Sequence, residues 1–295
     1  GGTEMINDVL LLVTQVGMLA FIVASMAAMG LGLTVSRIVE PLHDLRLIVL
    51  LLLANFVAVP LVAIATTRLL PMDESAATAI ILIGTCAGAP FLPKLAQLAR
   101  GDAALSVGLM VLLMVVTVIY APIVVPLAVE GATVDAWDIA SSLIVLMLIP
   151  LGIGLFIKAR YEELADSWVG GAGQIANVGL LMGISASLLV SWRDILGAIG
   201  SWIFIGLAIV LVAALLFGWL AGFGRSTGDM TVSALATAQR NIAAAIVVAV
   251  SLSGDVVVLT MVGALVIPIV LIIIAGEVGK RVGAGEVEAG PAEAG

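Results

Sequence analysis

Two basic residues, Lys94 and Arg240, lie deep inside apolar stretches of the sequence, whereas the other ten of the 12 lysines and arginines lie near the ends of such stretches. A charge at the centre of a membrane span is costly, and it is a candidate functional site by default. The alternative is that each long side chain reaches out of the bilayer to the headgroups. A buried cation suits the binding of an anion, which makes both residues candidates for an anion site.

The eleven residues that end at Lys94 read Gly-Thr-Cys-Ala-Gly-Ala-Pro-Phe-Leu-Pro-Lys and contain two glycines and two prolines. This composition predicts a broken helix, because proline removes a backbone donor and glycine permits unusual backbone angles. Backbone that is not helical is tolerated at membrane depth only where it is buried in protein or lines a cavity. Pro93 suits the first turn of a new half-helix, which would place Lys94 at the positive end of its dipole.

The sequence around Arg240 is Thr237-Ala238-Gln239-Arg240-Asn241, in an otherwise apolar run. Such a polar cluster at mid-depth is costly unless its groups meet a ligand, water or one another. The alternative is a polar seam that joins neighbouring helices by hydrogen bonds. The cluster predicts a second break in a membrane-spanning helix.

The composition defines the elements that must position these residues. Of the 295 residues, 62% are hydrophobic and only 11% are charged, which excludes a soluble globular protein and a disordered chain. Long apolar runs without alternation exclude an outer-membrane barrel and predict an all-α polytopic membrane protein. About nine spans are expected, at residues 7–34, 46–70, 75–99, 103–129, 137–158, 168–191, 198–223, 229–252 and 255–279.

Single copies of cysteine and histidine exclude a disulfide framework and a metal cluster built from these residues. We find no nucleophile–base pair and no phosphate-binding loop, so an enzyme is not expected. No cofactor, metal or nucleic-acid partner is predicted; the expected partners are the lipid bilayer and a small organic anion.

The distribution of basic residues predicts the orientation in the membrane. Odd-numbered connections and the tail carry most of the remaining lysines and arginines: Arg37, Arg46, Arg100, Lys158, Arg160, Arg225, Lys280 and Arg281. Even-numbered connections carry only Arg68 and Arg193. We expect the protein to lie in the cell inner membrane. By the positive-inside rule, its N-terminus is then outside and its C-terminus in the cytoplasm.

The two expected breaks fall at matching positions of two helix triplets. Spans two to four and seven to nine each have an interrupted middle member, and an odd number of spans separates them, so they enter the membrane from opposite sides. This pattern predicts inverted repeats with a site between two discontinuous helices.

At these residues the chain resembles the bile acid:sodium symporter family, in a nine-span bacterial form. The family's break followed by Ala-Arg-Gly-Asp resembles Cys86-Ala87-Gly88-Ala89 and Ala99-Arg100-Gly101-Asp102, and Ser106 ends the Ala-Leu-Ser run that follows. Met29 to Thr34, Asn55-Phe56 with Pro60, and Gln239 also match family segments.

The resemblance implies a panel of three spans and a core of six, with two crossing broken helices in the core. The panel would comprise residues 5–34 and 137–192, the core residues 45–130 and 197–280, and residues 281–295 a disordered cytoplasmic tail. In the family, two sodium ions bind behind the crossing and substrate binds between panel and core. Gln15, Gln174 and Asn177 are the polar panel residues expected to face it.

The chain departs from the family at its sodium ligands. Leu92-Pro93 replaces Ser-Asn, Leu235 replaces a glutamate and Met110 replaces a threonine. We therefore expect Lys94 to replace the sodium charge, with Arg240 as a second contributor, and the protein to transport organic anions without sodium. The expected ion-coupling residues are Lys94, Asn55, Ser106 and Gln239. The expected substrate-binding residues are Lys94, Arg240, Asn241, Gln239, Thr237, Pro93, Gln15 and Asn177.

Three other functions fit the same sequence. A sodium-coupled organic-anion symporter would use altered ligands for its ion. An arsenite-efflux-like permease would use Cys86, although a lone cysteine in an apolar span is usually a small core residue. A channel or sensor would use the same fold without alternating access.

Overall fold

The computed structural model describes residues 2–39, 43–129, 136–197 and 200–288, and its described residues form helices joined by short connections. The helices of the first half are α1 Gly2–Gly32, α2 Val35–Val39, α3 Leu45–Leu53, η2 Ala54–Ala58, α4 Val59–Leu69, α5 Glu74–Thr85, α6 Leu92–Leu98 and α7 Ala103–Ala128. Those of the second half are α8 Ala136–Leu143, η3 Ile144–Leu148, α9 Ile149–Arg160, α10 Glu162–Gly197, α11 Ile203–Ala221, α12 Thr227–Ala238, α13 Ile242–Val250 and α14 Gly254–Glu288.

The all-α membrane architecture is confirmed. Seven helical segments of the described chain are long and apolar enough to cross a membrane, and the continuous helices α1, α7 and α11 follow the expected spans closely. The half-helices α5 and α6 are each too short to count by themselves, and α10 is long but less apolar. The exact count of nine spans therefore stays a prediction.

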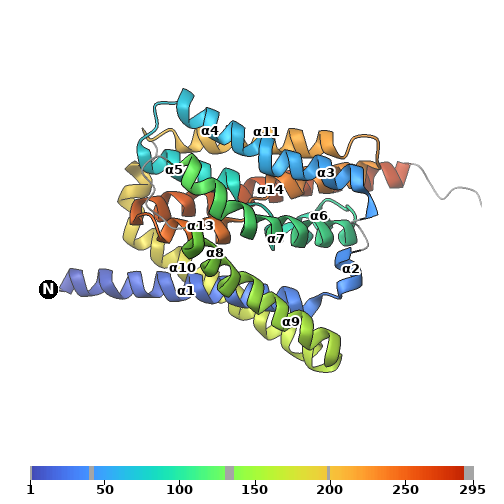
Figure 1. Cartoon of the computed structure of the whole chain (residues 1–295), viewed down its shortest axis with the longest axis horizontal. Helices are drawn as coiled ribbons and strands as arrows, with labels where there is room; N and C mark the ends of the chain where they lie inside the picture. The colour runs from blue at the N-terminus through green and yellow to red at the C-terminus, as the bar shows by residue number, and fades with distance from the viewer. Residues whose placement is uncertain (1, 40–42, 130–135, 198–199, 289–295) are drawn as a thin grey trace, which may run out of the picture.

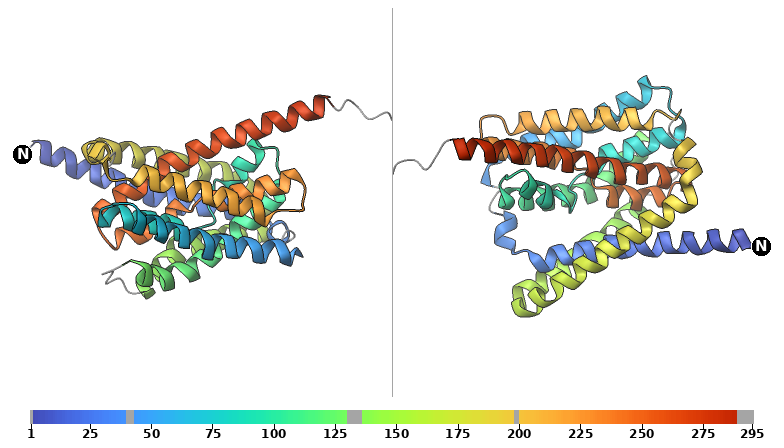
Figure 2. Two further views of the ribbon diagram at one scale, coloured as in Figure 1. Left: turned by 90° about the horizontal axis from the view of Figure 1, so that it is seen from above. Right: turned by 180° about the vertical axis from the view of Figure 1, so that it is seen from behind.

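The helices form two layers. The first layer contains α1, α8, α9 and α10, with α1 packed along both α9 and α10 (Figure 1). The remaining long helices lie on the other side, where α11 packs on α4 and α12, and α14 packs on α5 and α13 (Figure 2). The first layer contains the helices expected for the panel, and the second contains those expected for the core. The exact domain boundaries stay a prediction. Helix α14 continues to Glu288, and the rest of the expected tail, residues 289–295, lies outside the described residues.

Both broken helices occur where the sequence predicts them. Helix α5 ends at Thr85, and α6 begins at Leu92 with Pro93 in its first turn. Helix α12 ends at Ala238, and α13 begins at Ile242 after the N-cap Asn241. Asn241 caps α13, because its side chain accepts a hydrogen bond from the backbone N–H of Ala244 at 3.0 Å.

The Ala-Arg-Gly-Asp stretch has a structural role at the turn between α6 and α7. Arg100 has a positive φ of 54°, and the N–H of Gly101 donates to the carbonyl of Ala96 at 2.9 Å, which closes the end of α6. Asp102 then caps α7, because its Oδ1 accepts from the N–H of Leu105 at 3.0 Å. The motif therefore fixes the position of α6 against α7.

An ion-pair cluster joins the two halves of the core at one end. Arg225, in the connection between α11 and α12, contacts the carboxylates of Asp44 and Asp229. Asp44 is also the N-cap of α3. The N–H of Leu47 and the nearby Arg225 charge hold the pKa of the Asp44 carboxyl below its usual value. This cluster lies at the end that the charge distribution assigns to the cytoplasm.

Gly88 is the position in the first break where no other residue fits. Its φ is +79°, and a Cβ built there would lie 2.1 Å from the backbone nitrogen of Met114 on α7. We expect Gly88→Ala to lower the free energy of unfolding by more than the ~1–2 kcal/mol that a left-handed conformation costs an L-residue, because the clash adds to it.

The measurement is thermal unfolding of the purified protein in detergent. Gly170→Ala is the matched control, since Gly170 lies in α10 with open space around it and alanine favours a helix interior by roughly 0.5–1 kcal/mol. An unchanged unfolding temperature for Gly88→Ala would contradict the role assigned to this glycine.

Candidate functional site

The two breaks meet directly at the centre of the core. The N–H of Asn241 donates to the carbonyl of Cys86 at 3.0 Å, and its side-chain amide donates to the carbonyl of Gly88 at 2.9 Å. Thr117 of α7 holds the other side of the first break, since its hydroxyl accepts from the N–H of Ala87 at 2.9 Å and lies 3.0 Å from the carbonyl of the same residue. Backbone groups that the broken helices leave open are thereby satisfied within the core.

Arg240 is buried beside this crossing, with 1% of its surface exposed. Its guanidinium donates to the carbonyls of Ile83 and Gly84 at 3.0 and 2.7 Å, and to the carbonyl of Thr237 at 3.0 Å. A fourth bond of 2.7 Å runs to Oδ1 of Asn55. Among the described residues, none of the carboxylates forms an ion pair with Arg240. The guanidinium is therefore held by oxygen dipoles rather than by an opposite charge.

Asn55 is positioned by a π-helical turn, η2, inside the second span. Its side-chain amide donates to the carbonyl of Leu51 at 3.0 Å and to the hydroxyl of Thr237 at 3.1 Å. Pro60, shortly after η2, has no N–H for the carbonyl of Phe56, and the hydroxyl of Tyr120 donates to that carbonyl at 2.5 Å instead. The proline and the π-turn together let Asn55 face the buried arginine, as such turns often do at functional sites.

A cavity of about 650 Å³, here named cavity A, lies between the two layers. Its polar lining residues are Ser25 of α1, Asn177 of α10, and Gln239, Arg240 and Asn241 of the second break. The first break contributes Ala89, Pro90 and Phe91, and the first turn of α6 contributes Pro93. Asn177 is exposed towards this space from the panel layer. Gln239 is only 3% exposed, and within the described part of the chain its Oε1 has no hydrogen-bond partner. Cavity A is therefore mostly apolar, with polar groups from both layers.

A second cavity of about 710 Å³, here named cavity B, lies towards the other end of the same interface. Thr14 and Gln15 of α1, Ser142 of α8 and Ser251 beyond α13 are its polar lining residues. Met18 and Ile246 line both cavities, and both side chains are buried. A thin apolar wall thus separates the two spaces.

Apart from Lys94, the expected substrate-binding residues lie in three places. Arg240, Asn241, Gln239, Pro93 and Asn177 border cavity A, whereas Gln15 lines cavity B. Thr237 is fully buried behind the crossing, where its hydroxyl bonds to Asn55 and to the carbonyl of Ser233 at 3.0 Å. Sequence spacing could not separate Gln15 from Asn177, because their helices cross only in the folded panel layer.

Lys94 lies apart from the buried arginine. It is in the first turn of α6, as expected, but its side chain is exposed and lines neither cavity. Ser106 is fully buried in the first turn of α7. Of the two expected cations, only Arg240 contacts the oxygen groups at the crossing in the described part of the chain.

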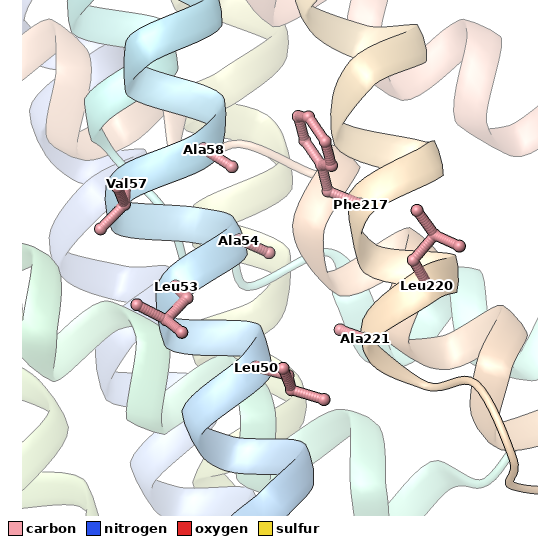
Figure 3. A pocket seen from close by; sticks show the side chains of 8 residues that line it. All are labelled: Leu50, Leu53, Ala54, Val57, Ala58, Phe217, Leu220 and Ala221. Carbon is pink, nitrogen blue, oxygen red and sulfur yellow. The ribbon is translucent and has the colours of Figure 1, made fainter.

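Cys86 and an apolar groove do not suggest further sites for substrate. Cys86 is fully buried and lines neither cavity, so its position does not favour the arsenite hypothesis. The groove, of about 300 Å³, lies between the α3–η2 segment and α11. Figure 3 shows its lining side chains, all of them apolar, which suits contact with lipid rather than binding of an anion.

Sequence reasoning missed Thr117 and Tyr120 of α7. Both hold carbonyls that the breaks or Pro60 leave without a helical donor. A threonine and a tyrosine inside an apolar span were visible as a signal. Their partners, however, lie 30 and 64 residues away in sequence, which only the folded core brings together.

One comparison with known proteins gives a match. The family model described as the Sodium Bile acid symporter family matches residues 18–197. This range includes α3 to α7 and most of the panel layer, with Asn55, the first break and Asn177. A search of curated proteins finds no match.

The positions of the two cavities predict from which side of the membrane a reagent in solution can reach the residues that line each of them. With Cys86, the sole cysteine, replaced by serine, we expect Asn177→Cys in cavity A to react with a membrane-impermeant maleimide from the cytoplasmic side. Ser251→Cys in cavity B should react from the outside, because the wall of Met18 and Ile246 blocks the passage.

Labelling of right-side-out and inverted vesicles measures this. Val212→Cys is the unreactive control, because Val212 is 63% exposed in the middle of the apolar helix α11, where lipid is expected to cover it. Preferential reaction of both cavity cysteines from one side would show that they line a single vestibule.

Proposed function

Because the chain belongs to the sodium bile acid symporter family, we propose that it is a secondary transporter of small organic anions that works by alternating access in the cell inner membrane. The chain is a multi-pass membrane protein, with seven apolar segments long enough to span. One observation carries the proposal: cavity A lies between the two layers and is bordered by both helix breaks. Movement of one layer against the other would open cavity A and cavity B in turn.

The charge distribution favours an anion as substrate. Arg240 borders cavity A, and no carboxylate of the described residues pairs with it. The N-terminus of α13 also faces this region through Asn241, and a helix N-terminus carries partial positive charge. The apolar walls suit the hydrocarbon part of a carboxylate or sulfonate, and Asn177 offers a hydrogen bond from the panel.

A fixed positive charge at the crossing would make sodium unnecessary, a role that the sequence assigned mainly to Lys94. The contacts support Arg240 in the central part of this role, since its guanidinium bonds to four oxygen atoms at the crossing. Lys94, exposed in the first turn of α6, would add to the positive potential near the entrance of cavity A.

A sodium-coupled symporter with altered ligands remains the second candidate. The observation in its favour is Gln239, whose buried Oε1 has no partner among the described residues. An oxygen of this kind is a suitable ligand for a hard cation.

Uptake into proteoliposomes tests the function and separates these candidates. Purified protein should accumulate a radiolabelled organic acid from a panel of carboxylates and sulfonates, and the rate should not fall when choline replaces sodium. Counterflow with unlabelled substrate should be saturable, which a channel would not show. Strict dependence on sodium would instead favour the symporter.

Asn177→Ala tests cavity A as the substrate site. Loss of a hydrogen bond to a charged ligand costs about 1.5–3 kcal/mol, so we expect kcat/KM for uptake to fall roughly 10- to 100-fold. Gln174→Ala is the matched control, because Gln174 is exposed on the same helix but does not line cavity A. Equal effects of the two substitutions would remove Asn177 from the substrate site.

A further inference from the structure

The oxygen atoms around Arg240 form a set that exists independently of its side chain. Three of them are the backbone carbonyls of Ile83, Gly84 and Thr237, and the fourth is Oδ1 of Asn55. Helix α5 ends at Thr85 and α12 ends at Ala238, so the three carbonyls belong to last turns, where no helical N–H follows to bond them. Their presence follows from where the helices break.

The same geometry concentrates negative potential. The C-terminal end of a helix carries about half an elementary negative charge, and two such ends point at one place. Asn55 adds a third oxygen-bearing element, η2, and is itself fixed by Thr237 and Leu51. A buried cluster of oxygen acceptors without a cation or a donor would be strongly destabilising.

Arg240 satisfies this cluster from within the chain. Its side chain carries both the positive charge and the N–H donors, and four donor contacts reach the four oxygen atoms. A guanidinium stays charged under all physiological conditions, and its attachment to the backbone prevents it from leaving. These groups are the kind of oxygen ligands that a free hard cation takes in proteins.

We propose that Arg240 is a built-in cation that permanently occupies a cation site made by the ends of α5 and α12 and by Asn55, and that removal of its side chain exposes this site to a free monovalent cation. The consequence for transport, which rests on the proposed function, is that the core needs no ion to be loaded before it moves. The chain would then carry its anion without a coupled cation, and a single substitution would make it respond to sodium or guanidinium.

Thermal unfolding of the full chain in detergent tests the site without any substrate. Wild type should unfold at the same temperature in sodium chloride and in choline chloride of equal ionic strength. Arg240→Ala should unfold at a lower temperature in choline, and both sodium and guanidinium at low millimolar concentration should raise that temperature. At a cation concentration about 100-fold above Kd the shift should be roughly 5 °C or more.

Two further variants keep the test decisive. Arg68→Ala is the matched control, since Arg68 is exposed at the end of α4 and its loss leaves no buried oxygen cluster; it should respond to neither cation. If Arg240→Ala cannot be purified, Arg240→Gln takes its place, because it removes the charge with less loss of volume. A sodium-specific stabilisation of wild type, or no cation response in either Arg240 variant, would overturn the proposal.

Transport measurements on the same variants separate this inference from the proposed function. Absence of organic-anion uptake by wild type, with a cation response in Arg240→Ala, would refute the function and leave the cation site standing. Uptake by wild type that continues in choline, with an Arg240→Ala variant that transports only when sodium or guanidinium is added, is the result expected if both are correct.

Discussion

The burial of Arg240 among the ends of two broken helices is the interaction on which the rest of the core depends. Two helices cannot end at mid-depth in a membrane unless their last carbonyls find donors, because lipid offers none. Arg240 supplies those donors for α5 and α12 at once, and Asn241 and Thr117 supply them for the residues between the half-helices. The broken helices are therefore stable only when their open backbone groups are hydrogen-bonded to one another and to these side chains. Each of these groups constrains where the others lie.

This arrangement separates two tasks that a buried cation could have performed together. The guanidinium is committed to protein oxygens, so the groups that remain available to a ligand in cavity A are Asn177, Ser25 and Gln239 and the walls of the cavity. The positive charge nevertheless acts over a few ångströms through a medium of low dielectric constant, where it favours an anion. In the proposed transporter, specific contact with the anion and its long-range attraction would thus come from different residues.

The panel layer forms part of the barrier between the two cavities. Met18 of α1 and Ile246 of α13 line both spaces, so the wall between them is shared by the two layers rather than formed within one of them. A barrier made from two bodies opens or closes when one moves against the other, without unfolding of either. Hydrogen bonds from α7 to both the first break and η2 tie these parts of the core together, and alternating access as proposed would move them as one unit.

The sequence by itself determined the membrane class and the positions of both breaks, because apolar run length, glycine, proline and polar clusters act locally on the backbone. It also singled out Arg240 as an exceptional charge. It assigned the central charge at the crossing to Lys94, whereas the structure places Arg240 there, and it did not separate Gln15 from Asn177. Those choices depend on which side of a half-helix faces the core and on how helices cross, and both are fixed by packing between residues more than 150 positions apart, such as Arg240 with Ile83 and Gly84. Only the tertiary structure brings the oxygen atoms of three helices around one side chain.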